Sequence, residues 1–140
     1  MMTTSVVSDA ASAVLARRCI VAGALLMLLA VILGAFGAHA LQAQLTPRQL
    51  ASYQTGVLYH QLHALGLILI GVVVRVTPPS RWAARSAAFL LAGIALFSGS
   101  IYAMTFGAPR WLGMVAPVGG TSFMVGWAAL ALHARKVASD

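Results

Sequence analysis

The chain has 140 residues, the length of a single domain, and its composition is that of a membrane protein. Hydrophobic residues make up 61% and charged residues 8%, whereas a soluble domain carries about 25% charged residues. Nine Lys and Arg residues against two acidic ones, Asp9 and Asp140, give a formal net charge of +7. This composition excludes a soluble enzyme built on paired carboxylates.

The basic residues are separated by long uncharged stretches, which argues against a nucleic-acid-binding surface. Gaps of 24 to 29 residues without a charged side chain follow Arg18, Arg48, Arg85 and Arg110. Each gap holds one apolar helix of about 20 residues, the length that crosses a hydrocarbon core of about 30 Å. A nucleic-acid binder would instead gather its basic residues on one polar face. We therefore expect a lipid bilayer as the surroundings of the chain and no nucleic acid as a partner.

Four membrane-spanning helices are predicted, in an all-α, polytopic membrane protein folded as a four-transmembrane-helix bundle. Thr46 and Pro47 favour a helix start, with Thr as N-cap and Pro at the first helical position. The pair Pro78-Pro79 cannot continue a helix and ends the second span. The predicted organisation is a disordered cytoplasmic N-terminus over residues 1–16, a membrane domain over 17–136 with spans at 19–38, 56–74, 86–104 and 112–133, and a cytoplasmic tail over 137–140.

The distribution of Lys and Arg predicts that both termini face the cytoplasm. Seven basic residues lie on the side of the termini and two, Arg48 and Arg110, lie on the opposite side. Cytoplasmic loops carry the excess of Lys and Arg in membrane proteins. An alternative is a cleaved signal peptide, because Ala38-His39-Ala40 follows an apolar run that begins after Arg17-Arg18. That run, of about 20 residues, is longer than the usual apolar region of 7–15 residues.

Small residues in the first span predict a close helix contact. Ala30, Gly34 and Ala38 recur at every fourth position, a pattern that lets two membrane helices approach each other. Our interpretation is a packing seam inside the bundle, with self-association of two chains as the alternative.

The start of the fourth span allows two interpretations. Pro117, Gly119 and Gly120 fit the first turn of a helix that begins there, or a backbone break over residues 115–121 whose freed polar groups need partners. The positions predicted for helix packing or a backbone break are Gly34, Gly37, Gly99, Pro117, Gly119 and Gly120.

Polar side chains within the spans are predicted to gather in the outer half of the bundle. His63 is 12 residues from Arg75, about 18 Å along a helix and therefore beyond the membrane midplane at about 15 Å. Tyr59 and His63 are four residues apart and share one helix face. Polar groups at membrane depth are functional candidates because they are costly. The predicted polar cluster consists of His39, Tyr59, His63, Ser98 and Tyr102.

A second pattern on the second span predicts which of its residues face inward. At 100° per residue, one stripe about 80° wide contains five residues: Tyr53, Gly56, His60, His63 and Leu67. The simplest interpretation of these polar groups is interhelical hydrogen bonding that orders the bundle. Haem or metal ligation by histidines is an alternative. No span contains Asp or Glu, so we predict no catalytic residues, no metal site and no cofactor.

Four short motifs occur in an order that resembles a known family. They are Gly34-Ala35-Phe36-Gly37-Ala38-His39, then Gln54-Thr55-Gly56 with Tyr59 and His63, then Phe97-Ser98-Gly99-Ser100 with Tyr102, and then Pro117-Val118-Gly119-Gly120 with Gly126-Trp127. Over about residues 19–135 the chain resembles the YgdD-like small membrane proteins, also called domain of unknown function 423, with transmembrane protein 256 as a eukaryotic relative. The resemblance implies four spans in the bacterial inner (plasma) membrane and no established activity. His60 lies outside the family pattern, which weakens a metal site that relies on it.

The expected function is that of a non-catalytic integral membrane component with an accessory or assembly role. A second copy or another membrane protein is the expected partner. The alternative is a small transporter or channel for a neutral or weakly basic solute that uses the outer-half His/Tyr/Ser cluster. A haem- or metal-binding redox membrane protein is the third alternative.

Overall fold

A computed structural model describes residues 2–78 and 80–138, and within these ranges the chain is helical without a strand. Two helices depart from α geometry for one turn each, and the chain enters its last helix through a 3₁₀ turn. In chain order the elements are α1 (Met2–Phe36), the π-helical turn η1 (Gly37–Leu41), α2 (Pro47–Val76), α3 (Arg81–Gly93), the π-helical turn η2 (Ile94–Ser98), α4 (Gly99–Thr105), the 3₁₀ turn η3 (Arg110–Met114) and α5 (Val115–Val137).

Four helical segments are long and apolar enough to cross a membrane, as predicted. They cover Ala10–Leu41, Pro47–Val76, Arg81–Thr105 and Arg110–Val137. The shortest has 25 residues, about 38 Å at 1.5 Å per residue, which exceeds a hydrocarbon core of about 30 Å. Each helix extends past its predicted span, because basic side chains at a span's end can reach the membrane surface while the helix continues.

The structure describes a helix over most of the segment of residues 1–16 that is predicted to be disordered. From Met2 on, the segment is the first part of α1. Four alanines favour a helix here, and Gly and Pro, which would interrupt it, do not occur. Met1, and the last two residues of the predicted tail over 137–140, lie outside the described residues, whereas Val137 ends α5.

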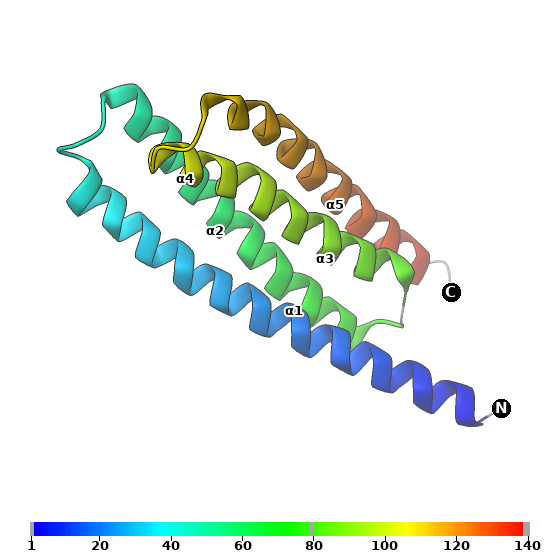
Figure 1. Ribbon diagram of the computed structural model, residues 1–140. Helices are drawn as coiled ribbons and strands as arrows, with labels where there is room; N and C mark the ends of the chain where they lie inside the picture. Colours follow the sequence, from blue (N-terminus) through cyan, green and yellow to red (C-terminus); the bar gives the residue numbers. More distant parts are fainter. Residues whose placement is uncertain (1, 79, 139–140) are drawn as a thin grey trace.

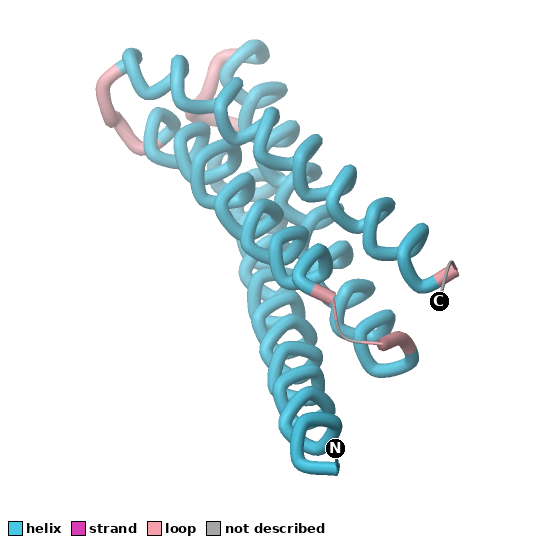
Figure 2. Tube along the Cα trace, turned by 90° about the vertical axis from the view of Figure 1, so that its right-hand side faces the viewer, coloured by secondary structure: helices cyan, strands magenta, loops and turns pink. Residues whose placement is uncertain are grey.

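The bundle consists of two helical hairpins that meet at α2. In one hairpin α1 packs along α2, and in the other the continuous rod of α3, η2 and α4 packs along α5 (Figure 1). Contacts of α2 with α3, η2 and α4 join the hairpins. Both termini lie at one end of the bundle, and the view turned by 90° shows the connecting loops at the two ends (Figure 2). This arrangement leaves α2 as the central helix.

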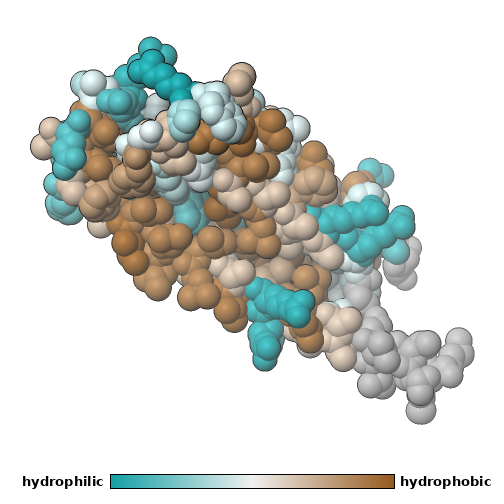
Figure 3. Space-filling view, in the orientation of Figure 1, coloured by the Kyte–Doolittle hydropathy of each residue, from teal (hydrophilic) through white to brown (hydrophobic). Residues whose placement is uncertain are grey.

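The surface between the two ends is apolar, as expected of a lipid-facing bundle. Hydrophobic side chains cover the middle of the molecule and hydrophilic ones gather toward its ends (Figure 3). Large apolar side chains such as Leu25, Leu58, Leu91 and Met124 are exposed on all four spans. In water these side chains would be destabilising, whereas in lipid they lie in their preferred surroundings.

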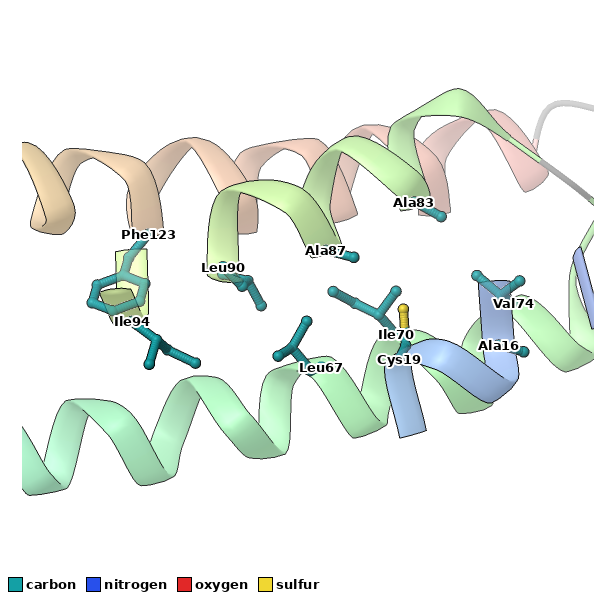
Figure 4. Packing of buried hydrophobic residues seen from close by; sticks show 10 residues of the cluster. All are labelled: Ala16, Cys19, Leu67, Ile70, Val74, Ala83, Ala87, Leu90, Ile94 and Phe123. Atoms are coloured by element: carbon teal, nitrogen blue, oxygen red, sulfur yellow. The ribbon is translucent and has the colours of Figure 1, made fainter. Parts of the chain in front are cut away.

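The core lies mainly between α2 and α3, where Leu67 and Ile70 pack toward Ala87 and Leu90 (Figure 4). Toward the end that carries the termini, α1 adds Ala16 and Cys19 to the same cluster, and α5 adds Phe123 at the other extreme. Small residues on α3 let α2 approach closely, which is how membrane helices compensate for the absence of a hydrophobic driving force.

The seam between α1 and α2 contains the small residues of the first span. Ala30 is fully buried, and a Cβ atom on Gly34 would lie 3.3 Å from Cγ1 of Val57. Farther along the seam, a Cβ atom on Gly23 would lie 2.7 Å from the carbonyl oxygen of Ala64. The stripe that contains Ala30 and Gly34 therefore contributes to packing within the chain, which is the first of the two predicted interpretations.

No break occurs at the start of α5, so the interpretation of residues 115–121 as irregular backbone is wrong. The helix is continuous from Val115 and holds Pro117 in its first turn, where proline is tolerated because the missing N–H has no helical partner there. A Cβ atom on Gly119 would collide with the backbone of Phe97, and this contact explains the glycine. The π-helical turns lie instead before Gln42 and Gly99.

Gly99 and Gly120, also predicted as packing or break positions, are less constrained. A Cβ atom on Gly99 would lie 3.9 Å from the carbonyl oxygen of Ile94, and one on Gly120 would lie 4.0 Å from Phe97. Gly37 is the opposite case, because its Cβ atom would lie 2.5 Å from Cε1 of Tyr53. Close approach thus requires glycine at Gly37 and Gly119.

Candidate functional site

The inward stripe of α2 is confirmed, and it carries most of the polar chemistry of the bundle. Its five predicted members are all buried: Tyr53, Gly56, His60, His63 and Leu67. Their spacing places them on the side of α2 that faces α3, α4 and α5. The candidate site is therefore the set of polar contacts that α2 makes with these helices.

The first group of contacts, the outer tyrosine–histidine cluster, joins α2 to α4 and α1 through Tyr53, His60 and Tyr102. Nδ1 of His60 lies 3.3 Å from the Tyr102 hydroxyl, and the two tyrosine rings are 5.5 Å apart. The Tyr53 hydroxyl donates a 2.8 Å hydrogen bond to the carbonyl oxygen of Leu33 on α1. His60 is 2% exposed, and its Nε2 atom is buried without a hydrogen-bond partner among the described residues.

The second group, the aromatic cluster, joins α2 to η2 and α5 through Tyr59, His63, Phe97, Phe123 and Trp127. The His63 ring stacks on Phe123 with ring centroids 3.4 Å apart and planes tilted by 12°. Tyr59 stacks on His63 at 5.8 Å and contacts Phe97 at 4.7 Å. Tyr59 is nevertheless 38% exposed, so it forms the rim of this cluster.

Three serines donate hydrogen bonds across helix interfaces. Ser98 donates to the carbonyl oxygen of Gly56 at 2.8 Å. Ser86 donates to Gly126 at 2.8 Å, and Ser122 donates to Phe89 at 2.7 Å. Each bond satisfies a buried hydroxyl with a backbone acceptor on a neighbouring helix, so these hydroxyls act as interhelical links.

The five residues of the predicted polar cluster do not form one cluster, and that expectation is wrong. Tyr59 and His63 belong to the aromatic cluster, and Tyr102 belongs to the outer tyrosine–histidine cluster. Ser98 bonds to the α2 backbone between them. His39 lies exposed on η1, and no hydrogen bond or ring contact among the described residues joins it to the other four. The helix spacing predicted the inward stripe of α2, but it could not show which helix each of these residues meets.

Three residues in these contacts lie outside the predicted polar cluster. His60 belongs to the predicted inward stripe but not to the predicted polar cluster, and it is the buried partner of Tyr102. Phe97 and Phe123 are apolar, and nothing in their residue type distinguished them from ordinary core residues. The i, i+3 spacing of His60 and His63 was the available signal, since both fall in the inward stripe.

A third polar contact lies at the end of the bundle that carries the termini. His133 is fully buried, and its Nε2 atom lies 3.0 Å from Oγ1 of Thr77. The Thr77 hydroxyl already donates its proton to the carbonyl oxygen of Val73 at 2.8 Å. Nε2 of His133 is therefore the donor, which leaves Nδ1 as an acceptor without a partner among the described residues. The contact fixes the end of α2 against α5.

The histidines do not converge on a common point. His60 faces Tyr102 on α4, whereas His63 stacks on Phe123 of α5. The described part of the chain contains no group of three His, Cys, Asp or Glu side chains that could hold a metal ion. The arrangement provides hydrogen bonds and stacked rings between helices.

Four apolar spans joined by interhelical hydrogen bonds and stacked rings define a small multi-pass helical membrane protein. A family model described as "Protein of unknown function (DUF423)" matches residues 33–120. The UPF0382 membrane protein YwdK of Bacillus subtilis is 38% identical over 117 residues, which cover 84% of this chain and 95% of that protein. The UPF0382 inner membrane protein YgdD of Escherichia coli K12 is 37% identical over 107 residues, which cover 76% of this chain and 81% of that protein.

A third relative, the UPF0382 membrane protein SERP0230 of Staphylococcus epidermidis, is 37% identical over 120 residues, which cover 85% of this chain and 96% of that protein. No solved structure matches the chain. The chain belongs to the DUF423 (UPF0382) family, and the predicted resemblance is confirmed. It is a multi-pass protein of the bacterial inner membrane.

Proposed function

We propose that this protein is a non-catalytic component of the inner membrane that has an accessory or assembly role. The observation that carries the proposal is the use of its polar side chains. Ser86, Ser98, Ser122 and Tyr53 each donate to a backbone carbonyl of a neighbouring helix. Groups engaged in this way order the bundle and are not available to activate a substrate.

The charge distribution supports the same proposal. The spans contain no Asp or Glu, so the histidines have no carboxylate that could orient them as general bases. An accessory protein in a membrane needs a stable shape and a lipid-facing surface that a partner can contact. In α1, 17% of the most apolar window is buried within the chain, against 50% in α2. The first span is thus the least buried of the four, and its outer face is open to lipid or to a partner.

A co-purification experiment from mildly solubilised native membranes tests the proposal. We expect a second membrane protein, or a second copy of this chain, to be recovered in a fixed ratio and identified by mass spectrometry. Leu28→Trp changes the outer face of α1, where Leu28 is 58% exposed, and should reduce that recovery. Leu132→Trp on α5 is the matched control and should leave the recovery unchanged.

A chain that remains monomeric after chemical cross-linking in native membranes would contradict the accessory role. Equal recovery of the partner with both tryptophan variants would contradict the assignment of the α1 face, although not the accessory role itself.

One observation favours a second candidate, a small transporter or channel for a neutral or weakly basic solute. Nε2 of His60 is buried in the outer half of the bundle and has no hydrogen-bond partner in the described part of the chain, and an unsatisfied polar atom at membrane depth is costly. Under this candidate, flux of a solute into liposomes that contain the protein should disappear with His60→Ala. Absence of flux for polar neutral and weakly basic solutes alike would remove the candidate.

A further inference from the structure

A lipid-facing groove runs between α2 and α5, and its volume is about 580 Å³, within the range of small-molecule sites. The wall formed by α2 extends from Leu62 to Val72, about 15 Å along the helix, which is half of a hydrocarbon core of about 30 Å. Trp127 forms the opposite wall on α5. The groove therefore has the length of a chain that occupies one leaflet.

His63 provides a polar atom near the outer end of this apolar groove. Its Nδ1 atom lies 2.6 Å from the carbonyl oxygen of Tyr59, and a carbonyl oxygen only accepts. Nδ1 is therefore the donor, and Nε2 of the neutral ring is an acceptor. The side chain is 5% exposed and lines the groove, and no described group bonds to Nε2. The groove thus presents one unmet hydrogen-bond acceptor to its occupant.

The rings around His63 fix this acceptor and add a flat apolar wall. Stacking on Phe123 at 3.4 Å holds the imidazole plane. Trp127 has its ring centroid 6.1 Å from that of His63 and is 39% exposed. A Cβ atom on Gly66 would lie 2.9 Å from Cδ1 of Leu90 and 3.2 Å from the Trp127 ring, so the glycine lets the indole pack closely against α2. An aromatic head group can lie against the indole ring.

We propose that the groove binds a lipid-soluble hydroquinone that carries an apolar tail. One phenolic hydroxyl donates a hydrogen bond to Nε2 of His63, the aromatic head packs against Trp127, and the tail follows α2 past Leu69 toward Val72. The fixed tautomer makes the site selective for the reduced form, because the carbonyl oxygens of a quinone only accept and cannot bond to Nε2. The binding leaves the redox state of the ligand unchanged.

Binding can be measured on the full-length protein in detergent micelles by native mass spectrometry. The probe is decylhydroquinone, and the comparisons are decylbenzoquinone, the dimethyl ether of the hydroquinone, and 1-decanol. We expect a saturable one-to-one complex with the hydroquinone. The quinone and the ether should bind about tenfold more weakly, the value of one buried hydrogen bond, and decanol should bind more weakly because it cannot stack on Trp127.

Three variants locate the site. His63→Phe keeps a ring on Phe123 but removes the acceptor, so hydroquinone and ether should then bind equally weakly. Leu69→Trp fills the groove at a 47% exposed position and should abolish the complex without altering the core. Leu91→Trp is the matched control, at a 41% exposed position of α3 that does not line the groove, and it should leave binding unchanged.

Equal binding of hydroquinone, quinone and ether by the unaltered protein would overturn the proposal, because it would show adsorption to an apolar surface. Binding of decanol as tight as that of the hydroquinone would overturn the aromatic assignment. Full affinity of the Leu69→Trp variant would overturn the location of the site in the groove. This result can be obtained even where His63→Phe fails to fold.

Discussion

Ser98 and Ser100 show how the surroundings of a residue decide its role in the membrane. Both are buried hydroxyls, at 0% and 4% exposure. Ser98 donates to Gly56 on another helix at 2.8 Å, whereas Ser100 donates to Phe97 within its own helical rod at 2.9 Å. Only the first bond holds two helices together, although the residue type and depth are nearly the same.

The two serines therefore predict different effects on stability. Ser98→Ala removes an interhelical bond and should lower the free energy of unfolding by about 0.6–1.7 kcal/mol. Ser100→Ala, the matched control, removes a local bond and should cost less, since an unfolded helix in the membrane can keep that bond. Reversible unfolding in mixed micelles, followed by circular dichroism, measures both values. Equal losses for the two variants would show that the Ser98 bond contributes nothing beyond a local one.

The contact between His60 and Tyr102 calls for a double-mutant cycle. Each of His60→Phe and Tyr102→Phe removes one partner of the 3.3 Å contact and leaves the ring volume nearly unchanged. If the contact stabilises the fold, the double variant should be less destabilised than the sum of the single ones, with a coupling of about 0.6–1.7 kcal/mol. The cycle uses the same unfolding measurement. Strict additivity would mean that the two side chains are neighbours without energetic coupling.

Helix spacing predicted which residues of α2 face inward, but not what they meet. The stripe from Tyr53 to Leu67 is a local property of one helix, so 100° per residue was enough to find it. The partners of His60 and His63 depend on the tilt and register of α4 and α5, which are set by packing between helices. Local pattern carries no such information, and for this reason five polar candidates were placed in one cluster that the structure divides.

At the scale of the element, glycine position decides how closely helices approach. Gly119 and Gly120 are neighbours at the start of α5, and the sequence could not distinguish them. Only Gly119 faces the α3–α4 rod, where a Cβ atom would collide with the backbone of Phe97. Gly120 has room, since its Cβ atom would lie 4.0 Å from Cδ2 of Phe97.

Alanine substitutions at these neighbours should have opposite effects. Gly119→Ala forces α5 away from η2 and should destabilise the bundle by about 1–3 kcal/mol, the range for overpacking. Gly120→Ala adds a methyl group in ordinary contact distance and should be neutral or stabilise the helix by up to about 1 kcal/mol. Thermal unfolding in detergent compares the two variants. A Gly119→Ala protein as stable as the unaltered chain would contradict the close α5–η2 contact.

The two π-helical turns are the elements that sequence patterns missed. A π turn adds one residue to a helical turn and rotates everything that follows. In the α3–α4 rod, η2 lies between α3, which packs on α5, and α4, whose Tyr102 contacts His60. Continuous apolar sequence hides such an insertion, because every register of an apolar helix is equally hydrophobic.

For the whole molecule, composition predicted the architecture and charge predicts its orientation. The uncharged gaps marked the four spans because burying a charge in lipid is costly, and this effect does not depend on how the helices pack. Composition and charge could not predict the arrangement of two hairpins around α2, because it depends on contacts between helices such as those at Gly23 and Gly66. Both termini lie at one end of the bundle, as any even number of spans requires.

The orientation can be tested by labelling single cysteines in a Cys19→Ala background, because the sequence contains one cysteine, Cys19, whose thiol is buried. Ala43→Cys lies exposed in the turn between α1 and α2, and Ala138→Cys lies exposed after α5. The seven basic residues on the side of the termini predict that this side faces the cytoplasm. A membrane-impermeant maleimide should therefore label Ala43→Cys in spheroplasts, and Ala138→Cys only after lysis.

The reverse labelling pattern would invert the topology and would place the outer tyrosine–histidine cluster on the cytoplasmic side. It would also move His63 of the α2–α5 groove into the inner leaflet, so the leaflet from which a ligand enters depends on this result.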